Sequence, residues 1–299
     1  MPVRILTSLF LLLPWALAAL AAAPTQYEVA KIPASLQENA NAVIRMHHTA
    51  FTVNSASSAT EKVKYAVTVL NEKAADQSTL AVPYDKSIKV NYIKASVYNA
   101  LGLPVKQLKK SDLQDQSAVS NISVHEDNRI KYATLTLPQY PYTVEFEYEV
   151  SYSVSLFYPK WAPQSEEFVS VESASFAVVA PASLDFRYKE VNLPKKGTTS
   201  SDNGTKTYLW ELSQVPAKKS ESSRPPFHEL IPMVYTAPAD FEYGTYKGSM
   251  RDWASFGVWF NQLNADRDRL PPATVEKIKQ LVGSEKDEYT KIRKVYEYM

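Results

Sequence analysis

The segment from Thr143 to Leu156 alternates strictly between polar and apolar side chains, and this alternation constrains the fold more than any other feature of the sequence. Its apolar members are Val144, Phe146, Tyr148, Val150, Tyr152, Val154 and Leu156. Successive residues of a strand point to opposite faces of a sheet, so the pattern predicts a strand with one face in a core and one in water. A parallel strand is usually covered on both faces, so the alternation favours antiparallel pairing.

Other segments with the same period predict further strands. The segment that contains Ile88 and Val97 changes phase at Tyr92-Ile93, which predicts a β-bulge or bend. The remaining predicted strands are Val43–Val53, Val63–Val69, Arg129–Leu137, Glu167–Val179, Leu184–Val191, Thr205–Leu212 and Met233–Phe241. Turn-rich pieces separate them, such as residues 55–58, 111–115 and 194–204. We therefore expect a mainly β fold, a two-sheet antiparallel β-sandwich over residues 22–244.

After Gly244 the apolar period becomes helical. Ser249 and Asp252 have the spacing of a capping box, and the predicted helix after them carries Trp253, Phe256, Phe260 and Leu263 on one face. A second predicted helix opens at Pro271-Pro272 and closes at Gly283. A third follows Ser284 and Asp287 and reaches Met299 without a stop signal. We expect residues 245–299 to be the helical start of a second, truncated domain.

Residues 1–21 have the pattern of a secretory signal peptide. Arg4 precedes an apolar run from Ile5 to Leu20, and Ala19-Leu20-Ala21 fits a small-x-small cleavage site. The run is short for a membrane span and contains Pro14. We expect an exported protein, periplasmic or extracellular, that is soluble and free of the membrane after cleavage. The sequence has no cysteine, so its fold must rest on a hydrophobic core rather than on disulfides.

Charge and histidine patterns argue against several kinds of site. The sequence contains 33 basic and 32 acidic residues, a balance that gives no electrostatic reason to expect nucleic-acid binding. His47 and His48 are adjacent on a predicted strand and should point to opposite faces, while His125 and His228 lie in separate segments. No spacing typical of metal ligands occurs. We predict no cofactor and no metal.

The acidic residues are interpreted in the same way. The pairs Asp112/Asp115 and Glu166/Glu167 lie in turn-like segments, where short-spaced acids usually cap loops or face solvent. Three further acids occupy the polar face of the long predicted strand, with Lys62 and Lys64 as expected cross-strand partners: Glu145, Glu147 and Glu149. Neither group predicts acid-base catalysis.

One aromatic-dense region is a candidate binding surface. It comprises Tyr140, Tyr142, Tyr158 and Trp161. Aromatic side chains stack on sugar rings or dock extended peptides, but they also plug the end of a sandwich or seat a neighbouring domain. Packing is the favoured interpretation, and three exposed, coplanar rings on one face would favour binding instead.

Several segments resemble the family called domain of unknown function 3857, which is found in exported bacterial proteins ahead of a transglutaminase-like domain. The matching segments are Asn39–Arg45, Val67–Glu72, Pro83–Lys86, Asp112–Asp115, Pro141–Tyr148, Trp161–Gln164 and Ser170–Glu172. Trp253–Trp259 and Lys294–Met299 resemble the entry to the transglutaminase-like domain itself. Their common order and wide spread make the resemblance specific.

The resemblance implies that catalysis belongs to the transglutaminase-like domain and not to the β domain. Transglutaminase-like domains use a papain-like Cys-His-Asp set, and the resemblance places that cysteine beyond Met299. This sequence has no cysteine, so no catalytic residue is carried over and we expect no enzymatic activity of its own. The expected function is a non-catalytic β domain that scaffolds, or positions substrate for, its own downstream transglutaminase-like domain. The alternative is an envelope module that binds carbohydrate or peptide.

Overall fold

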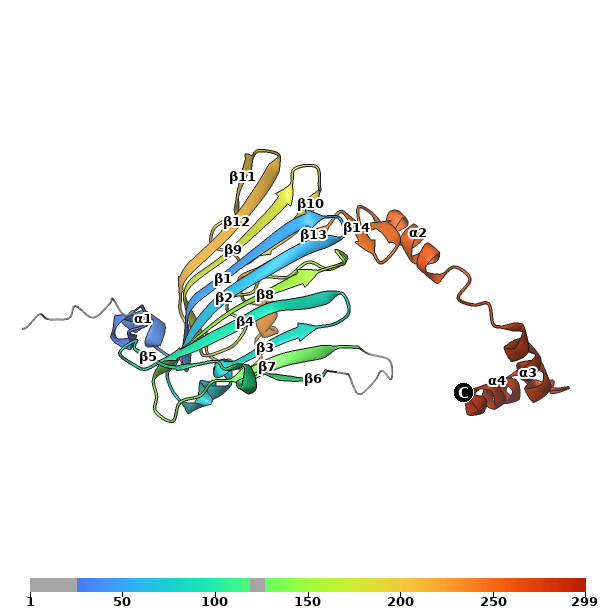
Figure 1. Ribbon diagram of the computed structural model, residues 1–299, viewed down its shortest axis with the longest axis horizontal. Coiled ribbons are helices and arrows are strands. Elements are labelled where there is room, and N and C mark those ends of the chain that lie inside the picture. The colour runs from blue at the N-terminus through green and yellow to red at the C-terminus, as the bar shows by residue number, and fades with distance from the viewer. Residues whose placement is uncertain (1–25, 119–126) are drawn as a thin grey trace, which may run out of the picture.

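The described residues form one large sheet and three small ones. The computed structural model describes residues 26–118 and 127–299, so the predicted signal peptide and His125 lie outside the described residues. The large sheet has eight strands in the order β11-β12-β9-β1-β2-β8-β4-β5, and its long members run side by side in Figure 1. Their bounds are β1 Ala42–Ser55, β2 Ser58–Val69, β4 Ile88–Tyr98, β5 Pro104–Gln107, β8 Tyr142–Tyr152, β9 Val169–Pro181, β11 Thr198–Asp202 and β12 Thr205–Val215.

The small sheets and the helices complete the fold. One small sheet has the order β3-β7-β6, and the other two are the pairs β10-β13 and β14-β15. These strands are β3 Thr79–Tyr84, β6 Gln114–Ser117, β7 Arg129–Thr134, β10 Phe186–Val191, β13 Met233–Pro238, β14 Asp240–Tyr243 and β15 Tyr246–Ser249. The α-helices are α1 Ala34–Gln37, α2 Trp253–Asn264, α3 Pro272–Val282 and α4 Glu288–Tyr298. Four 3₁₀ turns are η1 Val29–Lys31, η2 Glu72–Ser78, η3 Lys110–Asp112 and η4 Phe227–Glu229.

The mainly β prediction is confirmed, but the arrangement differs from two antiparallel sheets. Leu80 and Val82 of β3, Phe186 of β10 and Val234 of β13 share one buried core with the large sheet. The layer that covers the large sheet is thus built from separate small sheets. The strands β1 and β9 also pair in parallel. The alternation of β8 holds for β8 itself, which is antiparallel to both β2 and β4, and does not extend to this distant pair.

The predicted faces of β8 are confirmed within the strand, which ends at Tyr152 and not at Leu156 as predicted. Val144, Phe146 and Val150 are buried in the main core. Lys64 and Lys62 lie within 3.7 and 3.5 Å of the carboxylates of Glu145 and Glu147 on the opposite face. The long strand therefore separates an apolar interior from a face of paired charges.

Two irregularities adjust the register of the large sheet. In β4 the register shifts between Val90 and Tyr92, next to the bulge predicted at Tyr92-Ile93. In β1 an unpredicted shift lies between Ile44 and Met46. A bulge inserts one extra residue into one strand and so changes which residues face the core beyond it. Past this shift, His47 rather than His48 lies on the core face.

Helix α2 packs on the β14-β15 hairpin. Asp252 is its N-cap and accepts a 2.7 Å hydrogen bond from the Ser255 amide, whereas Ser249 ends β15. The ring of Trp259 lies 5.0 Å from that of Phe241 at nearly a right angle. Gly248 of β15 has no side chain, and a Cβ there would collide with both rings. The helix therefore packs against the hairpin at Gly248, where the absence of a side chain leaves room for both rings.

The apolar face predicted for α2 is partly wrong. Phe256 and Leu263 do pack around Trp259, but Trp253 is 89% exposed and Phe260 is 54% exposed. The helix carries aromatic residues on more than one face, and contact with the hairpin selects the face that is buried. The periodicity of the helix alone did not reveal that choice.

The last two helices follow their predicted bounds closely. Helix α3 begins at Pro272 and ends at Val282, and Gly283 caps it with a φ of +54° that suits glycine. Helix α4 begins after Asp287, which caps the Thr290 amide, so Ser284 is not its N-cap. These helices pack on each other and lie apart from the sheets in Figure 1. Within residues 26–118 and 127–299, none of the helices has the length and apolar character needed to cross a membrane.

Replacing Phe146 with alanine should lower the free energy of unfolding by about 3–5 kcal/mol, because the side chain is buried in the centre of the core. Glu147→Ala removes a hydrogen bond from Tyr92 and an ion pair with Lys62 at a partly exposed position. It should cost at most about 1.5 kcal/mol. Urea titrations of both variants measure the difference, and equal losses would contradict the assignment of the two faces.

Candidate functional site

A row of aromatic side chains crosses three strands of the large sheet. His47 of β1 lies opposite Tyr65 of β2, and Tyr65 lies opposite Phe146 of β8. The ring centroids are 5.3 Å apart in the first pair and 6.4 Å apart in the second. Directly opposed residues of antiparallel strands are near neighbours on one face. The row is therefore a product of strand register and of the bulge in β1.

This row forms the floor of a pocket of ≈ 350 Å³. Its walls include Asp76 and Gln77 of η2, Tyr148 of β8 and Glu166 of the segment before β9. The Tyr65 hydroxyl donates to Gln77 Oε1 at 3.3 Å, and Gln77 Nε2 donates to Glu166 Oε2 at 2.8 Å. Gln77 thus joins the floor to both walls. We name this site the aromatic pocket.

Two polar side chains, Asn71 and Gln164, hold the walls in place. Asn71 caps η2 by accepting a hydrogen bond from the Lys73 amide at 3.1 Å. Gln164 is fully buried and donates from Nε2 to the carbonyl oxygens of Val169 and Pro216, at 2.9 and 2.8 Å. Because these bonds bracket the segment from 165 to 168, they fix the position of Glu166.

The electrostatics of the aromatic pocket are negative. Burial raises the pKa of Tyr65, and the nearby carboxylates of Glu166 and Asp76 raise it further. Burial, with a smaller contribution from His48, lowers the pKa of His47 to about 4. The imidazole of His47 is therefore neutral at pH 7, and the charge of the pocket comes from its two carboxylates.

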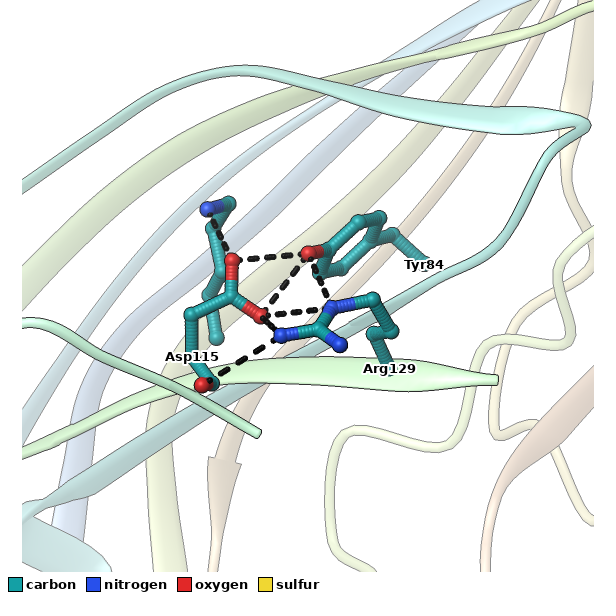
Figure 2. Close-up of polar contacts among 4 residues, drawn as sticks. Tyr84, Asp115 and Arg129 are labelled. Atoms are coloured by element: carbon teal, nitrogen blue, oxygen red, sulfur yellow. Dashed lines mark hydrogen bonds and ion pairs between the residues drawn. The ribbon is translucent and has the colours of Figure 1, made fainter. Parts of the chain in front are cut away.

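The other acidic residues singled out in the sequence serve structure. Asp112 accepts a hydrogen bond from the Lys109 amide at 3.2 Å. Figure 2 shows Asp115 and Arg129 pointing toward each other, with Tyr84 beside them. Asp115 lies 2.8 Å from Arg129 and 2.7 Å from Lys131.

These groups, which we name the polar cluster, join strands β3, β6 and β7. Hydrogen bonds from Lys131, Tyr84 and Arg129 hold the pKa of Asp115 well below its usual range. A carboxylate so strongly stabilised as an anion is a poor general base. The polar cluster therefore acts as a cross-strand tie, and the interpretation of these acids as structural groups fits the geometry.

The two adjacent histidines lie on opposite faces of β1, and the two members of the second acidic pair, Glu166 and Glu167, have different partners. His48 bonds to the Ser175 hydroxyl at 2.7 Å on the face opposite His47, as predicted. Glu167 forms an ion pair with Arg224 while its neighbour Glu166 lines the aromatic pocket. Within the described part of the chain, no three His, Cys, Asp or Glu side chains gather as a metal site would require.

The candidate surface of Tyr140, Tyr142, Tyr158 and Trp161 is not a shared exposed face. Tyr142 and Trp161 are buried, and Trp161 stacks on Phe176. Tyr158 packs against Phe51, with ring centroids 5.0 Å apart. Of the four, Tyr140 is left at the surface. Tyr142 belongs to β8, and its place in the strand alternation turns it into the core.

The residues of the aromatic pocket come partly from predicted strands and partly from a turn for which the sequence predicts no element. Asp76 and Gln77 lie in a turn without periodicity, and Tyr65 and Phe146 were interpreted as ordinary core positions. Their convergence depends on which strands are neighbours. The available signal was the flanking Glu166/Glu167 pair, which drew attention to that loop but not to its partners.

The fold and the pocket define a class: a β-rich domain whose large sheet carries a small aromatic and acidic site. The family model described as a domain of unknown function, DUF3857, matches residues 55–219. This range is more than half of the chain, so the chain belongs to the DUF3857 family. It includes Tyr65, Asp76, Gln77, Phe146 and Glu166, but not His47.

Solved structures extend the comparison of the fold. A protein from Parabacteroides distasonis, described as a putative protease, is 13% identical with a TM-score of 0.61. The match covers 86% of this chain and 50% of that one, so the chain spans about half the length of its relative. The similarity shows a shared fold.

Two further structures are less similar. An M1 zinc metallopeptidase from Deinococcus radiodurans is 13% identical over 70% of this chain and 46% of that one, with a TM-score of 0.31. A Legionella pneumophila protein described as a putative nutrient binding protein is 10% identical, with coverages of 80% and 78% and a TM-score of 0.31. Neither bears on function at this level of similarity. No curated protein matches the sequence.

Acid should destabilise the protein partly through His47. Its pKa is about 4 in the folded state and about 6.5 when unfolded, so the unfolded chain takes up the proton first. The contribution of neutral His47 to the free energy of unfolding is fully present above pH 6.5 and is lost as the pH falls toward 4. His47→Gln should therefore reduce the drop in urea midpoint between pH 7 and pH 4.5.

His228→Gln is the matched control, because His228 lies in an exposed position on η4. That variant should lose stability on acidification to the same extent as the parent chain. An undiminished drop in His47→Gln would show that His47 is not held neutral in the folded protein.

Proposed function

We propose that this chain is the non-catalytic β domain of a larger exported bacterial protein, in which it scaffolds, or positions substrate for, a downstream transglutaminase-like domain. The observation that carries the proposal is an uncovered apolar stripe on α4. Its members are Tyr289 (83% exposed), Ile292 (68%) and Tyr296 (79%). Their helical spacing puts them on one side of the helix.

An exposed stripe of this kind normally marks an interface. Contiguous apolar surface is costly in water, and it is usually covered by another domain or protein. Helix α3 packs along another side of α4, where Lys277 lies 4.6 Å from the ring of Tyr298. The stripe remains exposed because α3 covers a different side of α4. A following domain that covers the stripe would explain why its residues are apolar.

The comparisons support a multidomain arrangement. The family match lies within the β-rich part of the chain, and the P. distasonis structure extends well beyond the matched half. In the proposed arrangement, residues 1–21 are the export signal, residues 22–244 are the β domain and residues 245–299 begin the transglutaminase-like domain. The chemistry of that domain would come from its own Cys-His-Asp set.

Helix α2 would set the position of such a domain. Arg251, just before the helix, pairs with Asp185 and Asp240 at 2.8 Å each. Between α2 and the β10-β13 pair lies a groove of ≈ 630 Å³ lined by Tyr188, Tyr235 and other residues. A helix fixed at its start in this way gives the following elements a defined direction relative to the sheets.

A second candidate function is an envelope module that binds peptide or carbohydrate. The aromatic pocket favours it, because small concave sites with aromatic walls and a few polar groups are typical of ligand binding. The two functions are compatible, since a domain that positions substrate must also contact it.

Hydrogen exchange on the chain alone should show residues 284–299 exchanging much faster than strand β8. The core strand is paired on both sides, whereas the main packing partner of α4 among the described elements is the short helix α3. Comparable protection of the two segments would mean that the terminal helices are stabilised by the β domain, and the two-domain division would fail.

The proposed interface can be tested in the longer gene product with its downstream domain. Tyr296→Ser should lower the melting temperature of that product, while Arg293→Ser on the same helix should not, because Arg293 makes only a loose surface ion pair with Glu297. In the chain alone neither change should matter, because both side chains are exposed. If Tyr296→Ser leaves the melting temperature of the longer product unchanged, docking of the downstream domain on this stripe is contradicted.

A further inference from the structure

The aromatic pocket holds two carboxylates that lack a cation. Glu166 and Asp76 both act electrostatically on the Tyr65 hydroxyl at the floor. Neither forms an ion pair with a described Lys or Arg, although the adjacent Glu167 is paired with Arg224. Both side chains are exposed, so they place two unpaired negative charges on the solvent-facing side of the pocket, beside its aromatic rings. The pocket therefore favours a positively charged occupant.

The same pocket is short of hydrogen-bond donors. The imidazole of His47 makes no hydrogen bond to any described residue, and its Nδ1 atom is shielded from solvent. A neutral imidazole has one donor and one acceptor nitrogen, and because Nδ1 is closed to solvent, Nε2 is the ring nitrogen that a group in the pocket can reach. The acceptor of His47 and the carboxylates call for a group that brings several N–H donors.

The remaining lining is aromatic. Tyr65, Phe146 and Tyr148 present their rings to the pocket, and aromatic rings attract cations and pack well against alkyl chains. The pocket volume of ≈ 350 Å³ lies near the lower end for small-molecule sites. These dimensions suit one extended side chain better than a bulky ring system.

We propose that the aromatic pocket binds a primary alkylammonium group, of the kind carried by a lysine side chain or by a free alkylamine. The ammonium has three N–H donors and one positive charge, which match Glu166, Asp76 and the acceptor of His47. The alkyl chain then lies along Tyr65 and Tyr148, whose side chains are partly exposed. This site goes beyond the proposed scaffold function and does not depend on a downstream domain.

Isothermal titration calorimetry on the full chain at low salt tests the proposal. The probe is Nα-acetyl-lysine methylamide, and the matched probe is the same compound acetylated at Nε, which has nearly the same shape without the charge. We expect the charged probe to bind with a Kd of about 1 mM or tighter, and the neutral one to bind at least about tenfold more weakly.

Variants assign the binding to the pocket. Glu166→Gln keeps an acceptor for Gln77 but removes the charge, and Asp76→Asn does the same on the other wall. Each should weaken binding of the charged probe at least about fivefold. Glu211→Gln makes the same charge change at an exposed position on β12 and should leave binding unchanged. Hydrogen exchange of β2 and β8 confirms that each variant is folded.

The outcomes are decisive in both directions. Absence of measurable binding, equal binding of the two probes, or equal weakening by Glu211→Gln would overturn the proposal. A parallel titration with 1,5-diaminopentane distinguishes the source of the amine. Tighter binding of the lysine probe indicates an amine borne by a protein, and tighter binding of the diamine indicates a free one, while either result sustains an ammonium site.

Discussion

The antiparallel register between β2 and β8 is the constraint on which the rest of the structure depends. It sets Val67 against Val144 and Tyr65 against Phe146, so the large apolar side chains of both strands lie on one face of the sheet. A slip by one residue would turn the row of glutamates from Glu145 to Glu149 into the core. Burying those charges is prohibitive, so a single register is selected and the neighbours of both strands follow from it.

The sequence predicted elements whose signal is local and missed those that depend on distant partners. The alternation in β8 gave its faces, and Pro272 and Gly283 gave the bounds of α3. Strands β6 and β11 lie in polar, turn-like segments and are strands because a neighbour supplies their hydrogen bonds. The pocket was missed for a similar reason. Tyr65 and Phe146 look like core residues until the register, the bulge in β1 and the loop at Glu166 bring them together.

Segments that carry the family resemblance hold the walls of the aromatic pocket in position. Asn71 caps the turn that holds Asp76, and Gln164 anchors the loop that holds Glu166. Tyr84 and Asp115 join the strands of the neighbouring small sheet, as Figure 2 shows. Such residues define a scaffold, and different groups on the pocket walls could be presented by the same supports. The resemblance therefore specifies the architecture more strongly than it specifies a ligand.

The parallel pairing of β1 with β9 has a consequence for the order of folding. Strand β1 forms a hairpin with β2 at once, but its other edge must wait for a strand encoded well over one hundred residues later. Contacts between such distant segments form slowly, because a long loop has to close before they contribute. Until β9 arrives, the backbone of β1 is an open edge in the middle of the future sheet. A newly made chain is therefore most exposed to intermolecular strand pairing, and most in need of a chaperone, during that interval.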